Sequence, residues 1–179
     1  AHVFHAKVYV AINTILFENE IEPAVKLIHT LYNKGADAII IQDVGLLECD
    51  LPPIPIHAST QMNNKTVEKI QFLEAVGFSQ IVLARELSIP QITEIKKHTQ
   101  LPLEFFVHGA LCVSYSGQCY MSAHATGRSG NRGTCSQMCR HEFVLSGIPE
   151  YEQKKGYYLS LNDFHAGNYI EQLLDAGIQ

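Results

Sequence analysis

The sequence predicts an α/β fold, namely a (β/α) barrel of the TIM type that is incomplete in this chain and carries a loop insertion rich in cysteine and glycine. Short apolar runs alternate with amphipathic stretches of helical period, which is typical of a parallel sheet with crossover helices. The order helix, glycine, strand recurs at Gly35, Gly77 and Gly177. No glycine-rich phosphate loop follows a predicted strand, which disfavours the competing architecture, an open doubly wound sheet.

Each element follows from its own residue pattern. The run 38–41 is wholly apolar and indicates a strand buried on both faces. Gly35 ends the helix before that strand, and Ser88 and Pro90 begin a later helix as its N-cap and first-turn residue. A complete barrel takes about 250 residues, so two strands are expected to lie outside this chain. The patterns predict strands at 8–12, 38–41, 54–58, 81–83, 103–107 and 157–161, and helices at 20–33, 63–76, 89–98 and 169–175.

Composition indicates one globular domain over residues 1–179, with the insertion at 108–156. Hydrophobic residues make up 46% of the chain, which is enough for a sizeable core. The net charge of −5 gives no general attraction to nucleic acid or anionic lipid, and the longest apolar runs are too short to span a membrane, so no membrane partner is expected. Because it starts at Ala1 without a methionine, the chain is expected to be a piece of a longer protein.

Four of the five cysteines lie in the insertion, at Cys112, Cys119, Cys135 and Cys139. Thiolates are soft ligands, so this density predicts zinc or an iron–sulfur cluster. The spacing lacks the paired two-residue knuckles of common zinc ribbons, which leaves a cluster at least as well favoured as zinc. Disulfides and unrelated buried thiols are the alternatives. An odd cysteine count and the absence of an apolar leader predict a reducing, cytoplasmic location, where structural disulfides are rare. Cys49 is expected to be a small buried hydrophobe.

Polar side chains end nearly every predicted strand, and in a barrel these ends converge on the mouth that holds the chemistry. The candidate catalytic residues are His57, Arg85, Glu86 and His108, and Gln61 is a candidate substrate contact. The plainer interpretation of each residue is a helix cap or a hydrogen-bonded loop anchor. Glu104 lies inside an apolar run, so its carboxylate needs a partner, for which Arg85 is the candidate.

Three arginines and two tyrosines accompany the cysteines in the insertion. Arg128, Arg132 and Arg140 are candidate clamps for a carboxylate or phosphate, with purely structural hydrogen bonds as the alternative. Tyr115 and Tyr120 flank the second cysteine, where they either stack on a planar substrate or pack against the protein.

Several stretches together resemble the collagenase-like peptidase family U32. The chain reads EFFVHGALC at 104–112 and YSGQCYMS at 115–122, and the resemblance continues through HASTQM at 57–62, LAREL at 83–87 and GRSGNRG at 127–133. The run at 127–133, the cysteines that follow it and SLND at 160–163 look most like the branch that hydroxylates a cytidine of bacterial large-subunit ribosomal RNA. Related branches hydroxylate a transfer RNA uridine or a ubiquinone precursor.

The resemblance implies an oxygen-independent hydroxylase with a [4Fe-4S] cluster on Cys112, Cys119, Cys135 and Cys139. It also implies prephenate as a small anionic co-substrate and RNA as the partner, held by regions outside this chain. The peptidase label of the family fits the sequence poorly, because neither a nucleophile elbow nor a metallopeptidase motif is present. A hydrolase and a zinc-stabilised binding module remain as alternatives.

Overall fold

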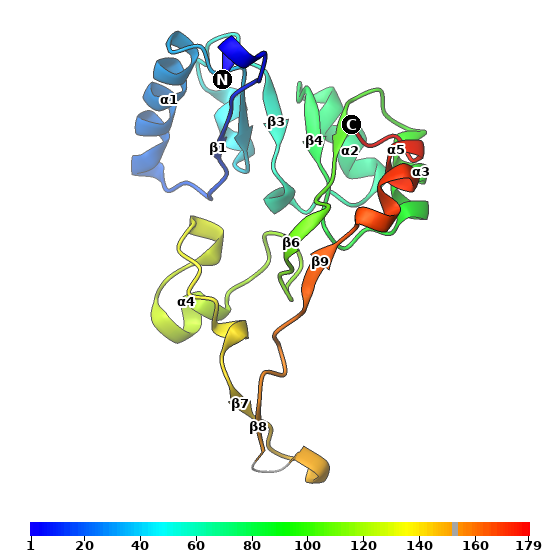
Figure 1. Cartoon of the computed structure of the whole chain (residues 1–179). Helices are drawn as coiled ribbons and strands as arrows, with labels where there is room; N and C mark the ends of the chain where they lie inside the picture. Colours follow the sequence, from blue (N-terminus) through cyan, green and yellow to red (C-terminus); the bar gives the residue numbers. More distant parts are fainter. Residues whose placement is uncertain (152–153) are drawn as a thin grey trace.

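The computed structural model describes residues 1–151 and 154–179, and its centre is a parallel sheet. The α/β class is therefore confirmed. Neighbouring strands follow one another in sequence order, as repeated strand–helix–strand units require. In Figure 1 the strands stand side by side with helices packed around them. The five strands are β1 (Tyr9–Ile12), β2 (Ala38–Ile41), β3 (Ile56–Ala58), β4 (Gln80–Val82) and β5 (Leu103–Glu104).

The main core lies between one face of this sheet and the helices that connect its strands. Ile39 and Ile41 of β2 are fully buried against helical residues such as Ile28 and Leu73. Burial of each such side chain stabilises the fold by roughly 1.5–3 kcal/mol. The helices are α1 (Glu18–Asn33), α2 (Val67–Ala75), α3 (Ile89–Lys96) and α5 (Ile170–Asp175).

The helix boundaries follow the capping residues. Ser88 and Gln91 form a capping box at the start of α3, with Pro90 in the first turn, as the sequence predicts. Helix α2 begins later than expected because Asn63 is left-handed, with φ 58°, and Thr66 caps the helix by accepting a hydrogen bond from the Lys69 amide at 3.3 Å. A helix cannot pass through a left-handed residue.

Two of the predicted strands differ in the structure. The apolar run at 103–107 is divided, because only Leu103–Glu104 joins the parallel sheet and a new strand begins at His108. The strand predicted at 157–161 is wrong. That segment contains a turn, and its Tyr157 and Leu161 side chains are exposed, so the apolar residues that suggested a strand bury little surface there.

Barrel closure stays a prediction. Among the described residues the sheet has two edges, at β1 and β5. Beside β5, Ile178 forms an isolated parallel bridge with Leu103, where a further strand of a barrel would begin.

The cysteine-rich segment is a long excursion between two paired strands. β6 (His108–Ala110) and β9 (Asp163–His165) are antiparallel neighbours, so the chain leaves and returns at one place, and the return lies beyond the predicted limit of 156. Figure 1 shows the excursion extending away from the lower end of the sheet. It contains α4 (Met121–Thr126) and a small hairpin of β7 (Phe143–Val144) and β8 (Lys155–Gly156).

The near arm of the excursion, which is the segment around Ser116 and Gly117, is held against the loops that follow β3 and β4. The Ser116 amide donates to Oε1 of Glu86 at 2.7 Å, and the buried Ser116 hydroxyl donates to Oε2 at 3.2 Å. The next residue, Gly117, has φ +73°, and a Cβ at this position would lie 1.9 Å from the backbone oxygen of Gln61. Only glycine permits this approach.

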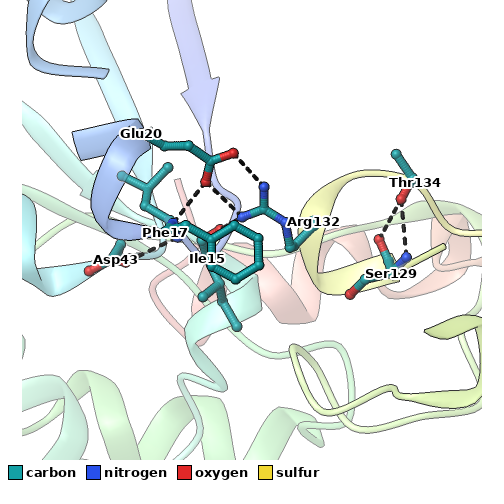
Figure 2. Close-up of polar contacts among 8 residues, drawn as sticks. Ile15, Phe17, Glu20, Asp43, Ser129, Arg132 and Thr134 are labelled. Atoms are coloured by element: carbon teal, nitrogen blue, oxygen red, sulfur yellow. Dashed lines mark hydrogen bonds and ion pairs between the residues drawn. The ribbon is translucent and has the colours of Figure 1, made fainter. Parts of the chain in front are cut away.

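The far arm of the excursion, which is the segment around Arg132, is held by the Arg132 side chain, as Figure 2 shows. Its guanidinium donates to both carboxylate oxygens of Glu20, at 2.5 and 2.9 Å, and to the Ile15 carbonyl at 2.5 Å. The same group lies 3.9 Å from the centre of the Phe17 ring. The hydrogen bond from Arg132 and the one from the Phe17 amide lower the pKa of Glu20 to about 2. A bidentate guanidinium–carboxylate pair fixes orientation as well as distance.

Arg140 joins the two ends of the excursion. It donates to the Leu111 carbonyl at 2.9 Å, to the Ser160 hydroxyl at 2.9 Å and to the Leu161 carbonyl. The outgoing chain after β6 and the returning chain before β9 are therefore tied together by one side chain.

Gly117→Ala should undock the near arm, whereas Gly127→Ala should not. Both glycines are left-handed, with φ +73° and +71°, so both variants carry the strain of a left-handed alanine, about 1–2 kcal/mol. Only at Gly117 does the new Cβ also meet backbone, because nothing lies within 4 Å of Gly127. Thermal unfolding and the rate of cysteine alkylation measure the two effects. Equal alkylation rates in the two variants would contradict this account of the arm.

Glu20→Gln should remove a pH-dependent contribution to stability. Because the folded pKa of Glu20, about 2, lies below its ordinary value of 4.5, the contribution is fully present above pH 4.5 and is lost as the pH falls towards about 2. The difference in urea midpoint between the unsubstituted protein and the variant should therefore shrink across that window.

Glu22→Gln is the matched control, because Glu22 pairs with Lys26 on the exposed side of the same helix, where its side chain is 78% exposed against 36% for Glu20. Its effect should be small at every pH. A difference for Glu20→Gln that stays constant from neutral pH to pH 3 would show that the ion pair with Arg132 does not stabilise the docked arm.

Candidate functional site

All four cysteines of the excursion line one cavity of about 340 Å³. They reach it from different turns of the chain. Cys112 follows β6, Cys119 precedes α4, Cys135 follows a 3₁₀ turn, and Cys139 lies within another. The fold therefore brings together residues that are separated in sequence.

The cysteine side chains are free thiols, and their surroundings suit sulfur ligands. The Gln137 amide donates to the Cys135 sulfur at 3.3 Å, and the Ser122 hydroxyl lies 3.7 Å from the same atom. Burial raises the pKa of the Cys139 thiol, and the neighbouring Cys112 raises it further. A metal that binds here must displace protons.

The thiols surround the cavity without converging on one point. Among residues 1–151 and 154–179, no group of three His, Cys, Asp or Glu side chains is placed so that it could hold a metal ion. Cys49 lies elsewhere, half-buried at the edge of the core, with its thiol 3.7 Å from the Gly45 carbonyl.

Several polar side chains in the cavity wall have no hydrogen-bond partner among the described residues. They include Arg85, which follows β4, Gln61, which follows β3, and Asn131 of the excursion. Arg85 and Gln61 are half-buried, and Asn131 is 5% exposed. Nothing in the sequence around Asn131, which lies between Gly130 and Arg132, marks it as a cavity residue. Its place in the cavity wall follows only from the folded position of the excursion.

The predicted partner of Arg85 is engaged elsewhere. Oε2 of Glu104 accepts a hydrogen bond from the side-chain amide of Gln80 at 2.9 Å, across the β4–β5 pair, so the expected Arg85–Glu104 pair is not formed. Glu86 is also occupied, because both of its carboxylate oxygens hold Ser116. The sequence correctly predicted that Glu104 needs a partner, but it did not predict that this partner is the neutral side-chain amide of Gln80.

The three arginines of the excursion have different surroundings. Arg132 and Arg140 donate hydrogen bonds to protein acceptors in the contacts that dock and close the excursion. In this arrangement both guanidinium groups bind the protein itself and not an anion from outside. Arg128 is exposed, and its side chain has no partner in the described part of the chain. It does not line the cysteine cavity.

The four candidate catalytic residues do not form one group. His57 is buried in β3, its ring packs edge-on against Tyr9 at 4.7 Å, and burial lowers its pKa. His108 is exposed on β6, with its ring 5.6 Å from the ring of His165 on β9. Of the four, only Arg85 lines the cysteine cavity.

Two exposed aromatic rings lie at the edge of the cavity. Tyr115 and Tyr120 line it, with exposed fractions of 61% and 65%. The Lys65 ammonium lies 4.0 Å from the centre of the Tyr115 ring, which is a cation–π contact. Neither ring is packed in the core, so both have faces available to a planar ligand.

No helix in the described part of the chain has the length and apolar character that a membrane crossing needs.

Comparisons with known proteins agree with the motifs. The model of peptidase family U32 matches residues 1–179. The 23S rRNA 5-hydroxycytidine C2501 synthase of Escherichia coli K12 is 51% identical over the whole chain, and the match covers 28% of that protein. The tRNA hydroxylation protein P1 of Bacillus subtilis and a collagenase of Porphyromonas gingivalis are each 31% identical, over 99% and 97% of the chain and 44% and 45% of their own lengths. The chain thus spans less than half of these relatives.

The fold has a counterpart among solved structures. The match with the structure of the U32 peptidase Mk0906 covers 62% of this chain and 49% of the Mk0906 chain, with a TM-score of 0.52 and 16% sequence identity. At that identity the likeness concerns the fold. The family model over the full length, together with the shared motifs, shows that the chain belongs to peptidase family U32.

Proposed function

We propose that this chain is part of an iron–sulfur-dependent, oxygen-independent hydroxylase of an RNA base, with a cytidine of ribosomal RNA as the target. The observation that carries the proposal is the meeting of four free thiols around one cavity, in a chain 51% identical to a ribosomal RNA hydroxycytidine synthase. Several further relatives are named as tRNA hydroxylation proteins, which supports RNA-base hydroxylation as the general activity.

The cofactor we propose is a [4Fe-4S] cluster on Cys112, Cys119, Cys135 and Cys139. A single zinc ion needs its sulfur ligands about 2.3 Å away at the corners of one small tetrahedron. The four thiols line one cavity of about 340 Å³, which gives room for a cofactor larger than one ion that binds each thiolate on a separate iron. When bound, such a cluster supplies one-electron redox chemistry.

The protein residues would hold and orient the substrates. Proteins recognise single-stranded RNA by stacking splayed bases on aromatic side chains. Tyr115 and Tyr120 offer two exposed rings at the cavity edge, so we assign the target base to this position. The small co-substrate, for which we propose prephenate, would bind beside the cluster. With a net charge of −5, the chain would rely on other regions of the full-length protein to hold the RNA backbone.

The compartment we propose is the cytoplasm, where RNA is modified. The five free cysteines of the described residues fit a reducing environment.

A peptidase is the second candidate, favoured by the family description and by the collagenase of P. gingivalis. Catalysis by a serine or cysteine peptidase needs a base next to the nucleophile. Within residues 1–151 and 154–179, no serine or cysteine side chain is hydrogen-bonded to a histidine. Hydroxylation of a transfer RNA uridine or of a ubiquinone precursor would use the same site with a different substrate.

Replacing any one of Cys112, Cys119, Cys135 or Cys139 with serine should abolish the visible absorption of anaerobically purified full-length protein, because a hydroxyl is a poor substitute for a thiolate on iron. Cys49→Ala is the control and should keep the spectrum, because Cys49 only packs at the edge of the core. A spectrum that survives Cys139→Ser but not Cys49→Ala would show that the assigned ligands are wrong.

Full-length protein should restore hydroxylation in an Escherichia coli strain that lacks its hydroxycytidine synthase. Mass spectrometry of 23S ribosomal RNA fragments should show the gain of one oxygen atom on a single cytidine, and a Cys112→Ser variant should not restore it. The same preparations should be assayed on collagen peptides. Peptide cleavage that persists in the Cys112→Ser variant, with no change in the RNA, would favour the peptidase.

A further inference from the structure

We propose that Arg85, Gln61 and Asn131 form a subsite for the carboxylate of a small organic acid, directly beside the four thiols. This inference rests on the proposed function, because it gives the anionic co-substrate a defined place. Among the arginines, it assigns the anion contact to Arg85, in place of the three arginines of the excursion.

Arg85 is a half-buried cation that forms no ion pair within the described residues. It lines the cysteine cavity, and its side chain has no hydrogen bond or ion pair within the described residues. The two carboxylates closest to it in sequence and topology are engaged, Glu104 by Gln80 and Glu86 by Ser116. A charge that is partly removed from water and left unpaired is costly, so this position favours an anionic ligand.

The backbone just before Arg85 is held firmly, while the Arg85 side chain has no hydrogen-bond partner among the described residues. Leu83 and Ala84 are fully buried, and the Ala84 amide donates to the Asn64 carbonyl at 3.0 Å. The buried Asn64 side chain in turn donates to the carbonyls of Ser59 and Val82, at 2.8 and 2.9 Å. The base of the Arg85 side chain is therefore held in place at the cavity wall, and binding of an anion would order only the side chain itself.

Gln61 and Asn131 show the same combination of a fixed backbone and an unpaired side chain. The Gln61 backbone carbonyl accepts from the side-chain amide of Gln42 at 3.3 Å, and the Asn131 backbone carbonyl accepts from the Ile15 backbone amide at 3.1 Å. Both residues line the same cavity as Arg85, and their side chains have no protein partner among the described residues. The two residues come from the sheet rim and from the excursion, so the subsite forms only when the excursion is docked.

The chemistry of these groups favours a carboxylate. The planar guanidinium donates two parallel hydrogen bonds that match the two oxygens of a carboxylate, and the amides can donate further bonds to the same group or to a neighbouring hydroxyl. Val113 and Met121 supply apolar surface for the carbon skeleton.

The test uses full-length protein with its cofactor, purified without oxygen, and isothermal titration with prephenate in the absence of RNA. Arg85→Gln should raise the dissociation constant on the order of tenfold to a hundredfold, because it removes a charge-assisted pair. Asn131→Ala and Gln61→Ala should each raise it by roughly twofold to tenfold. Lys34→Gln makes the same change in net charge on an exposed helix end far from the cavity and should leave binding unchanged.

Other variants and ligands separate this proposal from its competitors. Arg85→Lys keeps the charge but loses the planar fork, so it should bind prephenate more weakly than the unsubstituted protein and better than Arg85→Gln. Inorganic phosphate should bind more weakly than prephenate to the unsubstituted protein. If phosphate binds as tightly, the subsite is a general anion site and the carboxylate assignment is overturned.

The proposal is also overturned if Arg128→Gln, and not Arg85→Gln, weakens prephenate binding. It is equally overturned if Arg85→Gln leaves binding intact but shifts the reduction potential of the cofactor, since Arg85 would then only neutralise the thiolates. If Arg85→Gln fails to fold, Arg85→Lys and the two amide variants decide the question. Because binding is measured without RNA, loss of prephenate binding in Arg85→Gln supports the subsite even if the RNA assay fails.

Discussion

The docking of the excursion onto the end of the sheet is the constraint on which the rest of the structure depends. The four cysteines of the excursion do not belong to the main core, and no strand of the parallel sheet carries one. Their common cavity exists because Gly117 lies against the Gln61 carbonyl on one side and Arg132 pairs with Glu20 on the other. These contacts join two parts of the protein that have little apolar surface to share, so steric fit and charge pairing replace hydrophobic burial there.

The same arrangement explains why charged residues near the cavity have unequal roles. The side chains of Arg132, Arg140 and Glu86 form hydrogen bonds with other parts of the protein and hold the excursion in place. Arg85 projects from a stiff and buried base and keeps its capacity for a ligand. Proximity to cysteine in the sequence is therefore a poor guide to the role of a charged residue here, because the contacts that decide it come from residues 20 to 117 positions away.

The sequence was sufficient for the elements that local physics controls. The wholly apolar run of β2 predicted a buried strand, and the capping box at Ser88 predicted the start of α3. The clustering of four cysteines also predicted the one cavity that they share. Prediction failed where tertiary contacts decide the outcome. The segment 157–161 has the composition of a strand but finds no neighbour to pair with in the sheet, and Glu104 took its hydrogen bond from Gln80 across a strand pair.

We expect the docked cysteines to hold one cluster of four irons, and native mass spectrometry of the anaerobically purified full-length protein can test this expectation. The mass increment over the polypeptide should equal four iron atoms and four sulfides, lost together when the protein is exposed to oxygen. An increment of a single zinc ion, stable in air and released by a chelator, would contradict it.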